Sequence, residues 1–324
     1  MRHAAGERGV ALIVVLLVLA LLLTVAGEFA LAMRLEGRTT LNFGASVAAG
    51  YLAQAGYQRA VAEILLAAPA AGGNPPPVYV DKATGLLVLQ RSATGVVTLP
   101  TREGLTLGTG RFSYRISDER ARINPSRSTT SFRNLLEQLD VSRENRDVIY
   151  DSVQDWIDGN ENYRLNGAES DYYRGLPVPY KAKNRAFDSL EELLLVKGVT
   201  PQIFYGTPER PGLVEYLTVF STGINVNTAE APVLRAMGLA EVQVGQIHEH
   251  RPYLDRAALG ALGPETARDT FITSTVFRIE ATGEIPGQGK RTLFAIVERA
   301  QAQGGIPKVT VRNWRWLRED DTTR

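Results

Sequence analysis

Oxygen-bearing side chains recur at regular spacing in residues 158–169, DGNENYRLNGAE. The segment nearly fits the calcium loop of an EF-hand, in which the first, third, fifth and twelfth positions supply oxygen ligands. These positions are held here by Asp158, Asn160, Asn162 and Glu169. The sixth position, which should be glycine, is Tyr163, and the following SDYYRGLPVPY does not predict the second helix of an EF-hand. Two alternatives follow: calcium bound in a different geometry, or a solvated turn rich in Asp and Asn.

The remaining patterns give no support to catalysis. Asp155 and Asp158 would share one face of a helix, but such pairs are usually solvated or metal-bound, and no nucleophile with a neighbouring base accompanies them. The sequence contains no P-loop, HExxH or GxSxG motif, and no GxGxxG that opens a helix. The absence of cysteine excludes thiolate chemistry, and three histidines disfavour a histidine-rich metal site. We therefore expect a protein that is not an enzyme, and a secreted hydrolase ranks last among the functions considered.

The composition argues against nucleic acid as a partner. The chain has 324 residues, enough for two or three domains, and its 36 Lys and Arg against 35 Asp and Glu give a formal net charge of +1. Domains that bind nucleic acid are usually basic, so we expect no nucleic acid among the partners.

An apolar run without a charge extends over residues 10–27, and the first charge after it is Glu28. A helix of this length spans about 27 Å, close to the hydrocarbon thickness of a bilayer. Three interpretations compete: a secretory signal peptide cut after Ala30-Leu31-Ala32, a plain N-terminal membrane anchor, or processing after Gly9 that frees Val10. Helical spacing continues through residues 41–66, which is unusual for a signal peptide and predicts one helix over 10–67.

The rest of the chain alternates between strand and helix patterns. Strand patterns occur at 86–90, 96–99 and 111–116 and again after 271, while the segment between carries helical spacing, with N-caps expected at Asp188 and Asn227. INPS at 123–126 and INVNT at 224–228 each open a helix, which indicates a duplicated small helical unit. We predict an α+β fold, with a sheet packed on the long helix and a helical domain inserted between its strands. The predicted divisions are a leader at 1–9, a helix at 10–67 that spans the membrane over 10–28, sheet segments at 68–122 and 272–324, and the insert at 123–271.

These motifs resemble a known family. RGVALIVVLL after a short charged leader is similar to the processing site of type IV pilin-like proteins. VQDWIDGNEN, NGAESDYY, PYKAKNRAFDSLEELLLVKGVTPQIF and INVNTAEAPVLRAMG together resemble the protein K family of minor pseudopilins in the type II secretion system. The resemblance implies a pilin-like antiparallel sheet that carries an inserted helical domain related to SAM-like and helix-hairpin-helix folds.

The resemblance also implies how such a protein is processed and where it acts. A prepilin peptidase would cut after Gly9 and methylate Val10. The chain would cross the inner membrane once, with its C-terminal domain in the periplasm, and would meet the inner-membrane secretion platform. It would then lie at the tip of the pseudopilus with the I- and J-type minor pseudopilins, start assembly and support protein export across the outer membrane. Most pilins carry glutamate at the fifth position of the mature chain, and in this chain that position is Val14. An apolar residue there suits a subunit that has no earlier fibre subunit to contact.

Calcium in the acidic loop is a further implication of the resemblance. Carried over position by position, the candidate ligands are Asp158, Asn160, Glu169 and Asp171, with Asn162 and Asp155 as additional candidates.

A rival function belongs to a different class. The segment from INVNT onward also resembles the helix-hairpin-helix of membrane-anchored competence DNA receptors, which bind phosphate through a glycine-rich turn with basic support. Here the turn at 237–241 has one glycine, no basic residue, and an acid, Glu241, where phosphate would approach. We therefore expect the motif to be a structural packing unit.

Overall fold

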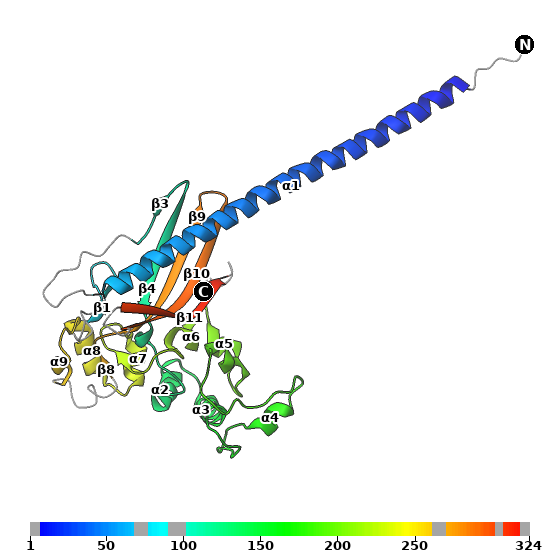
Figure 1. Ribbon diagram of the computed structural model, residues 1–324. Helices are drawn as coiled ribbons and strands as arrows, with labels where there is room; N and C mark the ends of the chain where they lie inside the picture. The colour runs from blue at the N-terminus through cyan, green and yellow to red at the C-terminus, as the bar shows by residue number, and fades with distance from the viewer. Residues whose placement is uncertain (1–6, 68–76, 90–101, 261–269, 302–306, 318–324) are drawn as a thin grey trace, which may run out of the picture.

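A single long helix dominates the N-terminal part of the computed structural model, which describes residues 7–67, 77–89, 102–260, 270–301 and 307–317. Helix α1 (Glu7–Leu66) is 60 residues long, and its N-terminal half projects away from the rest of the molecule (Figure 1). Side chains 11–44 are all exposed. Among the described residues, one helix is long and apolar enough to cross a membrane, and it is this one. The predicted continuous helix is confirmed, although it begins at Glu7, because a lone Gly9 does not break it.

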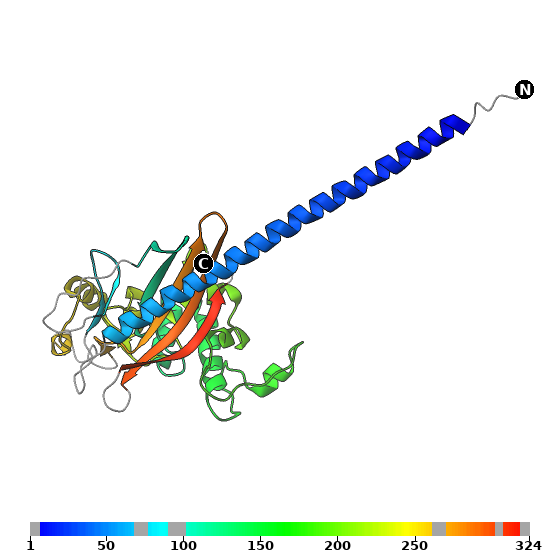
Figure 2. The ribbon, with the colours of Figure 1, turned by 45° about the horizontal axis from the view of Figure 1, so that its top comes forward.

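The C-terminal half of α1 packs across one face of a five-stranded antiparallel sheet (Figures 1 and 2). The sheet has the order β11-β10-β9-β4-β3, and its strands are β3 (Leu105–Leu107), β4 (Gly110–Asp118), β9 (Val276–Ile285), β10 (Gly289–Gln301) and β11 (Pro307–Leu317). A separate hairpin pairs β1 (Val78–Val80) with β2 (Leu87–Leu89). The predicted antiparallel sheet on a long helix is confirmed, while the strand predicted at 96–99 lies outside the described residues.

Small residues bring α1 unusually close to the sheet. Ala49 and Ala53 of α1 are fully buried against Gly283 of β9. A Cβ at Gly283 would overlap the Ala49 carbonyl oxygen and lie 2.7 Å from the Leu52 Cβ, so the backbones meet only because this position has no side chain.

A buried arginine of β10 hydrogen-bonds the C-terminal end of α1. The Arg299 guanidinium donates to the carbonyl oxygens of Ala67 at 3.0 Å and of Ser274 at 3.1 Å, and burial lowers its pKa to about 10. Because the last carbonyls of a helix have no partner within the helix, this side chain ties the helix end to the sheet.

A mainly helical insert lies between β4 and β9, which are neighbours in the sheet. Its helices are η1 (Glu119–Ala121), α2 (Thr129–Gln138), α3 (Arg143–Ile157), α4 (Ser170–Arg174), η2 (Leu190–Leu195), α5 (Pro201–Tyr205), α6 (Leu213–Tyr216), α7 (Ala231–Ala236), α8 (Glu241–His250) and α9 (Ala257–Gly260). Two-residue strand pairs join β5 (Gly206–Thr207) to β6 (Arg210–Pro211) and β7 (Ile224–Asn225) to β8 (Thr270–Phe271). The insert has its own apolar core, distinct from the core between α1 and the sheet. Asp118 pairs with Phe277, so the two ends of the insert lie side by side, as an insertion between neighbouring strands requires.

Two consecutive acids at the end of β4 hold the insert against the sheet. The buried Asp118 carboxylate accepts hydrogen bonds from Asn225 Nδ2 at 2.7 Å and Thr228 Oγ1 at 2.8 Å, and burial raises its pKa. Glu119, also buried, accepts from Arg278 of β9 at 3.0 Å and from Thr218 at 3.1 Å. The junction is therefore a polar network with specific partners on both sides.

The two IN segments of the insert share a local geometry. The Asn124 side-chain oxygen accepts from the N–H two residues later at 3.0 Å, and that of Asn225 does the same at 3.1 Å. Each preceding isoleucine forms a parallel bridge to a later segment, Ile123 to Leu217 and Ile224 to Thr270.

The two predicted N-caps were wrong. Ser189, and not Asp188, is the N-cap residue of η2, and the N–H groups of both residues donate to the Glu192 carboxylate. Asn227 does not cap a helix, because its side chain bonds the backbone of Tyr253 and α7 begins after Glu230.

Candidate metal centre

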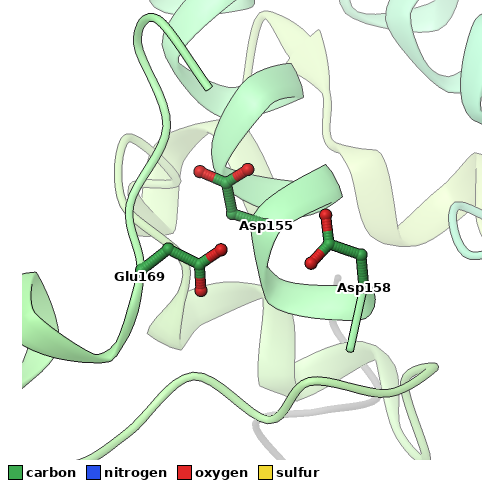
Figure 3. A group of neighbouring side chains, drawn as sticks. All are labelled: Asp155, Asp158 and Glu169. Atoms are coloured by element: carbon green, nitrogen blue, oxygen red, sulfur yellow. The ribbon is translucent and has the colours of Figure 1, made fainter. Parts of the chain in front are cut away.

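Three carboxylates converge where helix α3 ends. Asp155 lies in the last turn of α3, Asp158 is the residue that ends it, and Glu169 directly precedes α4 (Figure 3). One oxygen from each lies within 4.8 Å of the others, and Figure 3 shows the Glu169 and Asp158 carboxylates directed toward each other beside Asp155. Asp155 and Glu169 are fully buried. The loop therefore returns to the helix it leaves and brings acids from both of its ends together.

The backbone of the returning loop is fixed by specific contacts. Gly167 passes directly over Asp155, since a Cβ there would overlap the Asp155 Oδ2 atom. The Lys197 ammonium donates to the carbonyl oxygens of Asn166 at 3.1 Å and Gly167 at 3.0 Å. Asp151 Oδ2 accepts from the Asn166 N–H at 3.0 Å. These bonds hold the second half of the loop against α3.

One basic side chain lies among the three acids. Arg164 Nη1 is 2.6 Å from Asp155 Oδ1 and 2.6 Å from Asp158 Oδ2. Neither oxygen of Glu169 has a hydrogen-bond partner within the described part of the chain, although both are buried. Burial raises the pKa of Glu169 to about 7; the charges of Asp155, Asp158 and Glu161 add to the shift, and Arg164 opposes it. The single guanidinium thus pairs with two of the carboxylates, and no hydrogen-bonded counter-charge reaches Glu169 from the described residues.

The structure brings some of the predicted ligands together and leaves others apart. Asp155, Asp158 and Glu169 form the cluster, whereas the side chain of Asp171 is 76% exposed and pairs with Arg174 at 2.8 Å. Asn160 is exposed; its amide nitrogen donates to Asp158 Oδ1 at 2.8 Å, and its oxygen accepts from the N–H of the exposed Asn162. The expectation of no helix after the loop was wrong, because α4 begins at Ser170 and turns Asp171 toward solvent.

Two residues to which the sequence analysis gave no role organise the loop. Glu161 accepts from the Ser170 N–H at 3.2 Å, from its hydroxyl at 2.9 Å and from Asn184 Nδ2 at 3.0 Å, so it links the loop to the start of α4. Arg164 is the one base among six acids in residues 151–171, and this charge pattern was the available signal.

The donor set fits a hard divalent cation. Calcium takes oxygen ligands, carboxylates above all, and a buried carboxylate is stable only when it is paired, metal-bound or protonated. Glu169 is buried, unpartnered in the described residues and directed at two further carboxylates. These three residues could hold such an ion, which would supply the positive charge that the third carboxylate lacks.

Without metal, Glu169 should make the stability of the protein depend on pH. The folded state keeps the Glu169 proton up to about pH 7, whereas the unfolded state loses it near 4.5. The Glu169 contribution is therefore fully present below about pH 4.5, is lost as the pH rises to 7, and amounts to on the order of 3 kcal/mol. Urea unfolding in chelator at pH 5 and pH 7.5 should show this loss in the wild type and not in Glu169→Gln. Asp171→Asn, which alters an exposed acid of the same segment outside the cluster, should keep it; an equal pH slope in all three proteins would contradict the assignment.

The turn considered for DNA phosphate lies between α7 and α8. Gly238 has φ +92°, a conformation that favours glycine, and the Arg235 Nε atom is 2.6 Å from a Glu241 carboxylate oxygen. The base next to the turn is therefore already paired with the acid in it.

Comparisons with known proteins agree with the resemblance noted in the sequence. Residues 115–206, which include the three carboxylates, match the family model described as type II secretion system (T2SS), protein K. Type II secretion system protein K of Pectobacterium carotovorum is 34% identical over 40% of this chain and 41% of its own length. Type II secretion system protein K of Pseudomonas aeruginosa is 25% identical over 97% of this chain and 99% of its own length.

A solved structure has the same fold. The crystal structure of the GspK–GspI–GspJ complex from the enterotoxigenic Escherichia coli type 2 secretion system matches with a TM-score of 0.58 and 16% identity, over 89% of this chain and all of that chain. Nothing in these comparisons favours the DNA-binding alternative. The Pseudomonas aeruginosa relative aligns over nearly the full length of both chains, the family model covers residues 115–206, and the fold is shared, so the chain resembles type II secretion system protein K in sequence and in fold.

Proposed function

We propose that this protein is a minor pseudopilin at the distal end of the pseudopilus, where it starts assembly with the I- and J-type minor pseudopilins and supports protein export across the outer membrane. The observation that carries the proposal is the large helical insert between two neighbouring strands of the sheet. A fibre that grows at the membrane places its first subunit furthest out, with no neighbour above it. The insert would obstruct an upper neighbour, and this restricts the subunit to that end.

The long helix supports a membrane-anchored precursor of the fibre subunit. Side chains 11–27 of α1 are apolar or uncharged and exposed, as suits first the lipid of the inner membrane and then neighbouring helices in a fibre core. The globular part at the other end of the helix would lie in the periplasm. The prepilin peptidase and the inner-membrane secretion platform are the partners that this life cycle requires.

We also propose that Asp155, Asp158 and Glu169 bind calcium and that the ion has a structural role. When bound, the ion supplies positive charge that joins the end of α3 to the start of α4. The chain's own residues then act as a scaffold and not as catalysts, since the cluster contains acids without a nucleophile. Asn160 and Asn162 are close enough along the loop to remain candidates, whereas Asp171 would first have to leave Arg174.

The mature N-terminus should be a methylated Val10 when the protein is made together with its prepilin peptidase. The uninterrupted apolar run directly after Gly9 motivates this prediction. Intact-mass and peptide mass spectrometry of the membrane-extracted protein would measure it, with the peptidase-deficient strain as the control that keeps residues 1–9. A start at Met33, after Ala30-Leu31-Ala32, would contradict processing at Gly9 and favour a signal peptide.

The tip position is tested by counting and locating the protein in fibres. An epitope in the insert, detected by immunogold labelling of assembled pseudopili, should mark about one site per fibre, at one end. The same tag on the major pseudopilin should label the shaft and serves as the control. Co-purification of this protein with both I- and J-type minor pseudopilins, in the absence of the major subunit, is the second expected result. Labels repeated along the shaft at the spacing of the major subunit would refute the proposal.

A further inference from the structure

Arg164 occupies the position from which a cation would neutralise the acidic cluster. Its Nη1 atom contacts Asp155 and Asp158 at equal distances of 2.6 Å, and its side chain is 39% exposed. We propose that Arg164 is an internal competitor of the divalent cation: it neutralises the site when no metal is bound and swings out to solvent when metal binds. This inference rests on the metal site proposed above and adds how that site is regulated.

The competition follows from the atoms involved. Asp155 Oδ1 and Asp158 Oδ2 each accept from the same guanidinium nitrogen. A hard cation that binds these oxygens would place its charge within a few ångströms of the guanidinium, and like charges at that distance repel. A divalent ion also serves Glu169, which the single charge of Arg164 leaves without a hydrogen-bond partner in the described structure. Metal and arginine are therefore alternatives, and only the metal satisfies all three carboxylates.

The arginine can leave without dismantling the loop. Its backbone N–H donates to Asp155 Oδ2 at 3.3 Å, and its carbonyl oxygen accepts from the Gly167 N–H at 3.1 Å. Its neighbours Tyr163 and Leu165 are exposed, at 51% and 96%, so the chain on both sides faces solvent. Rotation of one side chain is enough to vacate the site, while the main chain stays anchored.

Such a competitor has two opposite effects. It lowers the apparent metal affinity, because the ion binds only the fraction of molecules in which the arginine has left. It also protects the metal-free loop, because it offsets the repulsion among carboxylates. Removing Arg164 should therefore tighten metal binding by about tenfold or more and loosen the metal-free loop at the same time. A residue that simply stabilised the fold would not give this pair of changes.

The test measures calcium affinity and loop exchange on the full chain in detergent. Isothermal titration calorimetry of chelator-treated protein with calcium would compare the wild type, Arg164→Gln and Arg185→Gln. Arg185 is the matched control, because it is an exposed arginine of the same insert and pairs with Asp188, which is not a candidate ligand. Hydrogen exchange of residues 158–169 would be followed with and without calcium. Arg164→Lys, which keeps the charge, serves if the glutamine variant does not fold, and its affinity should lie between the two.

The outcomes separate this inference from the metal proposal. We expect Arg164→Gln to bind calcium at least about tenfold more tightly and its metal-free loop to exchange faster than wild type. We expect Arg185→Gln to bind within about twofold of wild type. Wild-type binding with an unchanged or weaker Arg164→Gln affinity would overturn the competitor role and leave the metal site standing. No calcium binding by either protein would overturn the metal site itself.

Discussion

A Gly283→Ala variant should be destabilised by about 3 kcal/mol or more and should lose the close docking of α1 on the sheet. The added Cβ would overlap the Ala49 carbonyl oxygen and lie 2.5 Å from the Ala53 nitrogen. Both are backbone atoms of a long helix, so no flexible side chain can move aside, and the helix must shift as a body. Urea unfolding of the full chain in detergent, with hydrogen exchange of residues 45–64 as a local probe, would measure the effect.

Two glycines provide matched controls for this substitution. Gly289→Ala, in the neighbouring strand β10, should change stability little, because its Cβ would lie 3.6 Å from the nearest atom of α1, an ordinary contact. Gly44→Ala, on α1 with nothing within 4 Å, should be neutral or stabilising by up to about 1 kcal/mol, since alanine favours the helix. Equal stability of Gly283→Ala and Gly289→Ala would show that the helix and sheet do not meet as closely as described.

Removal of calcium should loosen the α3–α4 region of the insert and leave the sheet unchanged. The proposed ligands join the end of α3 to the start of α4, whereas the sheet has a separate apolar core. Calcium at about one hundred times its dissociation constant would stabilise the fold by about 2.7 kcal/mol, all of which is lost on chelation. Melting curves and hydrogen exchange with calcium or EDTA would show a lower melting temperature and faster exchange in residues 155–175, with β9 and β10 as internal controls.

A double substitution should reproduce the effect of the chelator. Asp158→Ala together with Glu169→Ala removes two of the three carboxylates, so EDTA should produce no further change in that variant. Arg164 moderates the effect in the wild type, since it replaces part of the lost positive charge. If EDTA alters neither the melting temperature nor the protease sensitivity of the wild-type loop, the acidic segment is a solvated turn.

Elements with local signals were predictable from the sequence. The length of α1 follows from an apolar run without charges and from helical spacing after it. The alternation of apolar and polar residues predicted β9, β10 and β11. Strands β1 and β3 were missed, because three residues are too few to show a period and these strands exist only through their partners.

The acidic site was predictable in part for a similar reason. Asp158 and Glu169 were found by their spacing in the sequence. That spacing places them at the two ends of the loop, and any loop that brings its ends together also brings these two carboxylates together. The position of Asp171 could not be derived, because it depends on where α4 begins and how that helix is rotated. The central place of Arg164 depends on the direction in which the loop folds back, and no periodicity encodes that direction.

The pairing of Asp118 with Phe277 has a consequence for the order of folding. Residues 119–275 separate two strands that must become neighbours, and closing so long a stretch of unfolded chain loses much conformational entropy. An insert that folds first brings its ends together and turns this distant encounter into a local one. In that order of events the sheet closes last, at a strand end that the bond between Asp118 and Asn225 already fixes to the insert. Tryptophan fluorescence can distinguish folding of the insert from closure of the sheet. Trp156 lies in the core of the insert, whereas Trp314 and Trp316 lie on β11.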